Sequence, residues 1–474
     1  MKSLSTFRTG LRFDLKRYTR APSLWFIALA TPIAAHFMMP DQDAGYAVVT
    51  LNEARPIPTA AVLGLELGVL AATLLTPLAY IFLRAGPTRH QPWQVSDITA
   101  YSRPVLTIGR WVADTFALWA LLAALTVAGL ILSLFRVDGT INFGHIIAAL
   151  WLPAAPSLAL VAAIRLFLDA RNMTRKWLGD VIFFITWMGL LLVSLIAATP
   201  IDGGAVTSRP YVDAFGSIAP LISSVDAPVT GVSIGGATNT GEKLSTEAWR
   251  AVTQSDYVAS RGIWLLAAFG LAMLAGLIWA PMKRTNTASG ARQVSWPLRL
   301  ANTILPDAIV GRSKSVPMRS LQASGWLGSY FRLTFRHWIW ILLSMAAAVT
   351  GFLMPFRTVA GPAILLTLIF PFTEASARWQ NRSLHSYLDT LGPSQWQRAA
   401  MSTFSHSLIA VLVCTPAAMR AASNNELQWL PHIAIICFGV PIAIIALAIL
   451  TRGAVAGRMV MLIAWYFYLS SGAG

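Results

Sequence analysis

Long apolar stretches separated by short polar ones dominate the pattern of this chain. A helix needs about 20 mainly apolar residues to cross a bilayer, with a range of about 17 to 25. Eleven stretches reach or approach that length, and two of them, 359–373 and 459–471, are short enough to be interfacial or re-entrant. The eleven are residues 23–40, 60–83, 111–135, 144–164, 178–199, 262–281, 338–355, 359–373, 399–419, 427–451 and 459–471. The pattern predicts an all-α protein, a polytopic transmembrane helical bundle of about 11 or 12 spans.

Charged residues inside these stretches are few and of one sign. They are the carboxylates Glu66, Asp114 and Asp180, with no Lys or Arg. A basic residue at the centre of a membrane helix costs about 2.5–3.5 kcal/mol on insertion scales. The absence of basic residues is therefore what membrane insertion predicts.

Composition and charge agree with this assignment. Only 12% of the 474 residues are charged and 56% are hydrophobic, whereas a soluble domain carries about 25% charged residues. The net charge of +16 could face nucleic acid or the inner side of a membrane. Most of the 36 Lys and Arg residues lie in alternate loops, beginning with the N-terminal segment, and the asymmetry survives when the two long loops are dropped. The N-terminus is therefore predicted to be cytoplasmic, and the lipid bilayer, not nucleic acid, explains the charge.

The N-terminal segment and the two cysteines do not change the predicted topology. Residues 1–20 are basic and amphipathic, and the following apolar run lacks a cleavage site in good context, so a retained first helix is expected. Cys414 and Cys437 lie in apolar runs without metal-ligand spacing, which is typical of buried small hydrophobic residues.

An internal repeat divides the chain. The first span ends with residues 36–40, and the seventh ends with the similar residues 351–355. The loop 93–104 likewise resembles 385–396, each placing a short amphipathic segment and a proline before a long span. We predict a first membrane half, 1–281, with an outer loop at 200–261, then a basic cytoplasmic linker and interfacial helix at 282–337. A second membrane half is expected at 338–474.

This order of features resembles the permease subunits of ABC-2-type exporters. In that family the first inner loop carries a coupling helix that docks on the ATPase. Segment 89–110 is similar to the family pattern there, with Tyr101-Ser102-Arg103 and then Gly109-Arg110 opening the next span. The second copy, Leu388-Asp389-Thr390-Leu391, departs from the pattern because Ala399 stands where the glycine would be.

The resemblance implies an exporter permease in a bacterial inner membrane, with two copies of a separate ABC ATPase subunit as partner. This chain contains no phosphate-binding loop, so it is expected not to be an enzyme and to hold no cofactor, with ATP and Mg bound by the partner. The family implies six spans per domain and twelve in a fusion of two, whereas eleven are counted with the C-terminus outside. The implied ATPase-coupling residues are Trp93, Ser96, Asp97, Ile98, Tyr101, Arg103, Leu388, Asp389, Thr390 and Leu391.

Among the intramembrane carboxylates, Glu66 is the candidate for a transport pathway. Asp114 and Asp180 lie near span ends and are predicted to be structural, with Asp180 pairing locally with Arg175 or Lys176. No catalytic or metal-binding pattern is found in the sequence. Two alternatives remain open: a secondary, ion-coupled transporter, and an integral-membrane enzyme acting on lipid-linked substrates.

Overall fold

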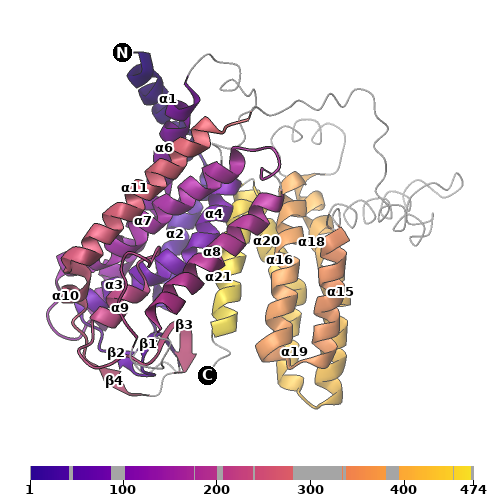
Figure 1. The fold of residues 1–474 in the computed structure, drawn as a ribbon. Helices are drawn as coiled ribbons and strands as arrows, with labels where there is room; N and C mark the ends of the chain where they lie inside the picture. Colours follow the sequence, from indigo (N-terminus) through magenta and orange to yellow (C-terminus); the bar gives the residue numbers. More distant parts are fainter. Residues whose placement is uncertain are drawn as a thin grey trace, which may run out of the picture. The chain divides into compact units, whose positions relative to one another are not determined.

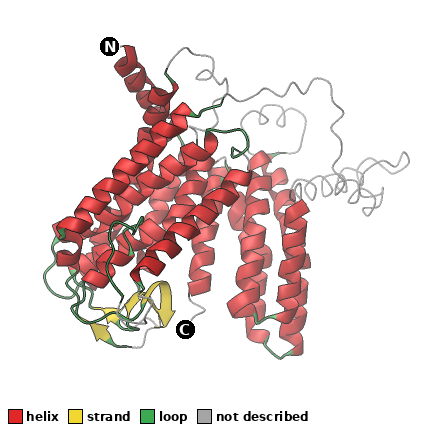
Figure 2. Cartoon of the chain, viewed as in Figure 1, coloured by secondary structure: helices red, strands yellow, loops and turns green. Residues whose placement is uncertain are grey.

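The structure is a helical membrane bundle that forms two compact units, Met1–Lys283 (unit 1) and Arg284–Gly472 (unit 2). The computed structural model describes residues 2–41, 46–86, 102–175, 177–199, 206–238, 241–280, 334, 338–379, 394–451 and 453–470. Each of the eleven predicted spans overlaps a helix within these ranges (Figure 2). The predicted fold class is therefore confirmed.

The helices differ in how well they could cross a membrane alone. Seven described helices are long and apolar enough, and two bent helix pairs raise the number to nine if each pair is one span. Two further apolar helices are shorter, at Trp340–Leu353 and Val455–Trp465. The sequence pattern predicts the positions of the spans, but it does not predict that two of them are broken.

The described part of unit 1 contains eight helices of ten or more residues. They are α1 (Lys2–Thr19), α2 (Pro22–Met38), α3 (Ala60–Thr73), α4 (Leu75–Arg84), α6 (Arg103–Arg136), α7 (Phe143–Asp169), α8 (Trp177–Ala198) and α11 (Ser255–Leu277). Helices α1 and α2 meet at an angle of 60°, and α3 and α4 meet at 48°. Pro22 lies in the first turn of α2, where its missing N–H costs no helical hydrogen bond.

Close packing of α3 against α7 forms the centre of unit 1. All residues of α3 are buried. A Cβ atom added at Gly64 would lie 2.3 Å from the Ile146 carbonyl oxygen, and one at Gly68 would lie 2.7 Å from that of Leu150. The two glycines are one helical turn apart, so together they let the backbones of α3 and α7 approach, as small residues do in membrane helices.

One end of unit 1, which we call the strand end, carries the only described β-structure. Strand β1 (Tyr46–Leu51) pairs antiparallel with β3 (Val232–Thr238), and β2 (Arg55–Pro56) pairs parallel with β4 (Lys243–Leu244). Two short helices, α9 (Ile218–Ser223) and α10 (Ala248–Thr253), lie at the same end. The loop predicted at 200–261 is thus a folded cap that shares a hydrophobic core with α3 and α7.

Polar contacts hold this cap to α11. Asp213 accepts hydrogen bonds from the backbone N–H groups of Ile218 (2.7 Å) and Ala219 (2.9 Å), at the start of α9. Arg261 donates to the carbonyl oxygens of Pro210 (3.1 Å) and Asp213, while its guanidinium lies over the Tyr257 ring. Since Arg261 is 2% exposed, the cap is fixed to the bundle by a buried cation.

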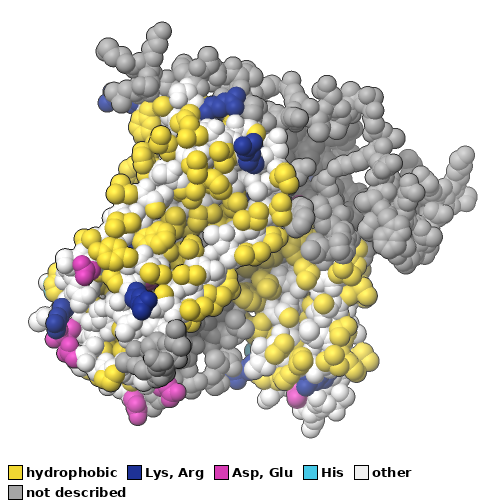
Figure 3. Space-filling view, viewed as in Figure 1, with side chains coloured by type: hydrophobic (Ala, Val, Ile, Leu, Met, Phe, Trp, Pro, Cys, Tyr) yellow, Lys and Arg dark blue, Asp and Glu magenta, His cyan; other side chains and the backbone are white. Residues whose placement is uncertain are grey.

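The surface of unit 1 is apolar between its two ends. Exposed large side chains such as Leu134, Ile185 and Leu266 cover the long helices, and Figure 3 shows hydrophobic side chains along the face in view. Acidic side chains gather at the strand end in the same view. This distribution is the one expected for a protein whose middle faces lipid.

Unit 2 contains α15 (Trp338–Leu353), α16 (Gly361–Trp379), α18 (Gln395–Ser423), α19 (Leu430–Ala434), α20 (Val440–Thr451) and α21 (Val455–Ser470). Three short segments interrupt them: η1 (Phe356–Ala360), η2 (Leu427–Trp429) and η3 (Ile435–Gly439), of which η1 and η3 are π-helical. Ser394 and Gln397 form a capping box that begins α18. One apolar core joins α15, α16, α18 and the 427–451 segment.

Candidate functional site: a buried charge cluster

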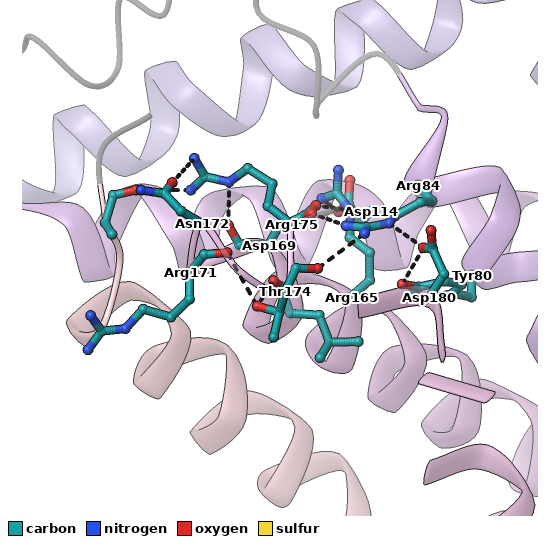
Figure 4. Close-up of polar contacts among 12 residues, drawn as sticks. Tyr80, Arg84, Asp114, Arg165, Asp169, Arg171, Asn172, Thr174, Arg175 and Asp180 are labelled. Atoms are coloured by element: carbon teal, nitrogen blue, oxygen red, sulfur yellow. Dashed lines mark hydrogen bonds and ion pairs between the residues drawn. The ribbon is translucent and has the colours of Figure 1, made fainter. Parts of the chain in front are cut away.

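Five charged side chains meet at the end of unit 1 opposite the strands. We call Arg84, Asp114, Arg165, Asp169 and Asp180 the charge cluster (Figure 4). Arg84, Arg165, Asp169 and Asp180 lie within about one turn of an end of α4, α7 or α8, and Asp114 lies about three turns into α6. The cluster therefore connects four helices through side chains that a bilayer would otherwise exclude.

Arg84, the last residue of α4, connects α7 and α8. Its Nη1 donates to Asp169 and its Nε donates to Asp180 at 2.7 Å. Its Nη2 donates to the carbonyl oxygen of Thr174 at 3.2 Å. Tyr80, one turn earlier on α4, donates from its hydroxyl to Asp180 at 3.0 Å. The end of α4 is thus fixed by two carboxylates and one backbone carbonyl.

Arg165 connects α7 to α6. Its Nη1 donates to Asp114 Oδ2 at 2.9 Å, and its Nε lies 3.0 Å from Asp169 Oδ2 on the next turn of α7. Tyr18 of α1 donates its hydroxyl to Asp114 Oδ1 at 2.6 Å. Since the phenol is 1% exposed, this bond also ties the N-terminal helix to the bundle.

Burial makes these contacts strong structural constraints. The side chains of Arg84, Asp114, Arg165 and Asp169 are 8%, 0%, 1% and 4% exposed, whereas that of Asp180 is 45% exposed. A buried ion pair gains little over an apolar pair, but removing one partner leaves the other charge uncompensated and is strongly destabilising. The two guanidiniums share Asp169, so removing Arg165 leaves the buried Asp114 without a cation, and removing Arg84 leaves the half-exposed Asp180 without one.

A second group of contacts fixes the chain where α11 ends and α6 begins. Arg103 donates to the Trp279 carbonyl oxygen at 3.1 Å, and Arg175 donates to that of Ala280 at 2.9 Å. The guanidiniums of Arg110 and Arg175 lie 5.5 and 5.0 Å from the Trp279 ring centroid. We call Arg103, Arg175 and Trp279 the anchor residues. Arg175 also donates to the Asp169 carbonyl oxygen at 2.8 Å, which joins the anchor residues to the charge cluster.

Most residues predicted to couple to an ATPase lie outside the described residues. Only Arg103 can be placed; Trp93, Ser96, Asp97, Ile98, Tyr101, Leu388, Asp389, Thr390 and Leu391 cannot. The prediction for those nine positions stays a prediction. Arg84 and Arg103, however, lie a few residues before and after the segment 87–101 that carries the first group, and both are held by the bundle.

The carboxylates predicted to be structural are placed in detail. Asp114 is structural as expected, with Arg165 and Tyr18 as partners. Asp180 pairs with Arg84 and Tyr80 of α4, which the sequence did not predict. Of its two predicted partners, Lys176 lies outside the described residues and Arg175 hydrogen-bonds the backbone carbonyls of Asp169 and Ala280. Backbone acceptors at a helix end compete with a nearby carboxylate, and sequence spacing does not show them.

Glu66 lies far from this cluster, on α3, between the two close-packed glycines in sequence. It is 5% exposed, and among the described residues its carboxyl has no hydrogen-bond partner. Arg55, at the strand end, hydrogen-bonds the backbone carbonyl oxygens of Asp41 (2.8 Å) and Pro40 (2.7 Å) and not Glu66. Glu66 is therefore a buried carboxyl without the local partners that structural carboxylates have here.

Sequence reasoning missed the two central arginines and Asp169. Arg165 and Asp169 stand four residues apart, and so do Tyr80 and Arg84. That spacing puts each pair on one helix face. This spacing was overlooked because Arg84, Arg165 and Asp169 follow the apolar stretches and were assigned to loops. In the structure α7 continues to Asp169.

Compared with known protein families, curated proteins and solved structures, the chain matches none significantly. Within the described ranges, no group of three His, Cys, Asp or Glu side chains is placed to hold a metal ion. The charge cluster and the anchor residues are therefore the features from which a function can be inferred.

Proposed function

We propose that this chain is the membrane-spanning permease subunit of an ABC-type exporter, working with a separate ATPase subunit. The observation that best supports the proposal is that both flanks of segment 87–101 are held by buried or partly buried arginines. Arg84 holds one flank to α7 and α8, and Arg103 holds the other to the end of α11. A force applied to that segment would act on α4 and α6 and, through the two arginines, on α7, α8 and the end of α11.

This arrangement suits mechanical coupling. ATP-driven closure of a partner would move the segment, and the arginines would carry the displacement into the helices as rigid elements. Packed interfaces have discrete arrangements, so a small displacement at one end can favour a different packing of whole helices. The bend of 48° between α3 and α4 lies on the same path, because α4 ends at Arg84. Helix α3, which precedes the bend, is buried and carries Glu66.

A secondary, ion-coupled transporter is the second candidate function, and Glu66 is the observation that favours it. A buried carboxyl on a broken helix is a usual ion or proton site in such carriers. An integral-membrane enzyme is the least supported candidate, because no described group of three His, Cys, Asp or Glu side chains is placed to hold a catalytic metal.

Co-purification tests the proposal. The full chain, isolated from its native membrane in mild detergent, is expected to bring an ATPase subunit with it. The double variant Asp97→Lys with Asp389→Lys is expected to lose that subunit, whereas Arg171→Glu, at the same end of unit 1 but pointing away from the charge cluster (Figure 4), is expected to keep it. If wild-type chain brings no ATPase, or if the double variant retains both ATPase and transport, the permease proposal is wrong.

A further inference from the structure

The two cysteines of the chain face one another across a helical hairpin in unit 2. Helix α18 ends at Ser423 and the next helical segment begins at Leu427. Cys414 lies nine residues before the end of α18, and Cys437 lies ten residues after Leu427. In an antiparallel hairpin, residues equally far from the turn lie side by side. The connection thus puts both thiols at one level, about 13–15 Å from the turn at 1.5 Å per residue.

The side chains meet as this register predicts. Both cysteines are free, belong to the same apolar core and are 1% and 4% exposed. Helix α18, which carries Cys414, packs directly against η3, which carries Cys437. Helix axes pack about 8–10 Å apart and Cα atoms lie about 2.3 Å from the axis. Facing Cα atoms can therefore come within the roughly 4.4–6.8 Å that a disulfide requires.

A local irregularity of the helix occurs at the same place. Cys437 is the middle residue of the π-helical segment η3, which interrupts the helix between α19 and α20. Single π-helical turns are rare and are frequent at functional sites. Here the extra residue widens the turn that carries one thiol, opposite the regular helix α18 that carries the other.

We propose that Cys414 and Cys437 form a redox-active dithiol that closes to a disulfide between α18 and η3. Two Sγ–H bonds break and one Sγ–Sγ bond forms. Two electrons and two protons pass to a lipid-soluble oxidant of the quinone class, which becomes the hydroquinone. The oxidant must be lipid-soluble because neither thiol is exposed. The disulfide would fix the hairpin at its middle, and this proposal does not depend on the transport function.

Alkylation and peptide mapping test the dithiol in the full chain in native membranes. The membranes are treated with duroquinone, whose fully substituted ring does not add thiols, and in parallel with diamide. The chain is then denatured, blocked with a maleimide and digested. We expect a linked peptide pair containing Cys414 and Cys437, loss of both maleimide sites, and recovery of both sites after reduction.

Two variants distinguish a disulfide between the two facing thiols from non-specific oxidation of either thiol. Cys437→Ala leaves Cys414 without a partner, so Cys414 should stay alkylatable. Cys437→Ala combined with Phe438→Cys moves the thiol to a side chain that is 54% exposed and should give no link to Cys414. Free thiols at both positions after both oxidants would overturn the proposal, and so would a link that joins two chains.

Discussion

At the residue scale, Arg165 and Glu66 show two different ways in which a membrane bundle holds a charge. Arg165 is almost fully buried and contacts two carboxylates. Glu66 is also buried, but no described residue hydrogen-bonds its carboxyl. A buried charge paired with opposite charges favours one particular packing, whereas a buried ionisable group without partners destabilises the fold and is retained mainly where function needs it.

Replacing Arg165 by methionine should therefore make unit 1 easier to unfold. The variant leaves Asp114 without a cation and Asp169 with Arg84 alone, and breaking a buried ion pair lowers the free energy of unfolding by about 3–5 kcal/mol. Thermal unfolding of the purified chain in detergent measures the change. Arg171→Met, an exposed arginine two residues beyond α7, should stay within about 0.5 kcal/mol of wild type. Adding Asp114→Asn to Arg165→Met should restore part of the loss; a double variant that is simply additive would contradict the pairing.

Glu66→Leu should behave in the opposite way. Burial of an unpartnered polar group costs roughly 1–3 kcal/mol, so the apolar variant should keep or raise the unfolding temperature. If Glu66 belongs to the transport pathway, the same variant should lower transport in vesicles. Thr73→Val on the same helix is the matched control, because the Thr73 hydroxyl donates to Val69 O at 2.7 Å and its loss should cost about 1 kcal/mol. A Glu66→Leu chain that unfolds more easily and transports normally would assign Glu66 a structural role.

At the element scale, the sequence best predicts those helices that can be recognised from the length of an apolar stretch alone. Every predicted span overlaps a helix because a long apolar segment in lipid has only the helix as a way to satisfy its backbone. The bends, the π-helical turns and the strand pairing could not be predicted in this way. Strand β1 pairs with residues about 185 positions later, and short strands of this kind depend on which loops the bundle brings together.

The contact between α3 and α7 gives an element-scale prediction. Gly64→Ala and Gly68→Ala should each destabilise unit 1, because the new methyl group would meet α7 backbone at 2.3 and 2.7 Å. Overpacking of this kind costs about 1–3 kcal/mol. Gly270→Ala on α11 is the matched control: no atom lies within 4 Å of the added Cβ, so the change should be neutral or stabilising by about 0.5–1 kcal/mol. Thermal unfolding in detergent distinguishes the two cases, and equal stability of all three variants would contradict the close packing.

At the scale of the whole molecule, the two units repeat an order of elements. In each, a helix ends two residues before a proline, at Met38 and Leu353, and is followed among the described helices by one further span and then by a long helix, α6 or α18. In unit 1 that further span is α3 with α4, which is bent by 48°, whereas in unit 2 it is η1 with α16, a continuous helix that starts with a π-helical turn. This order is consistent with the predicted duplication. The candidate site could be predicted only in part, because Arg103 was singled out by resemblance while Arg84 and Arg165 acquire their roles through contacts between distant helices.

Orientation in the membrane decides whether the charge cluster can face an ATPase at all. The distribution of Lys and Arg predicts that the cluster end is cytoplasmic and the strand end external. Single cysteines at exposed positions test this, because the native Cys414 and Cys437 are buried and should not react with an impermeant maleimide. Thr140→Cys, before α7, and Asn424→Cys, after α18, should be labelled in intact spheroplasts, whereas Met173→Cys, beyond the other end of α7 and 75% exposed, should be labelled only after permeabilisation. The reverse pattern would place segment 87–101 outside the cell, where no ATP-driven partner could reach it, and would remove the permease proposal while leaving the fold intact.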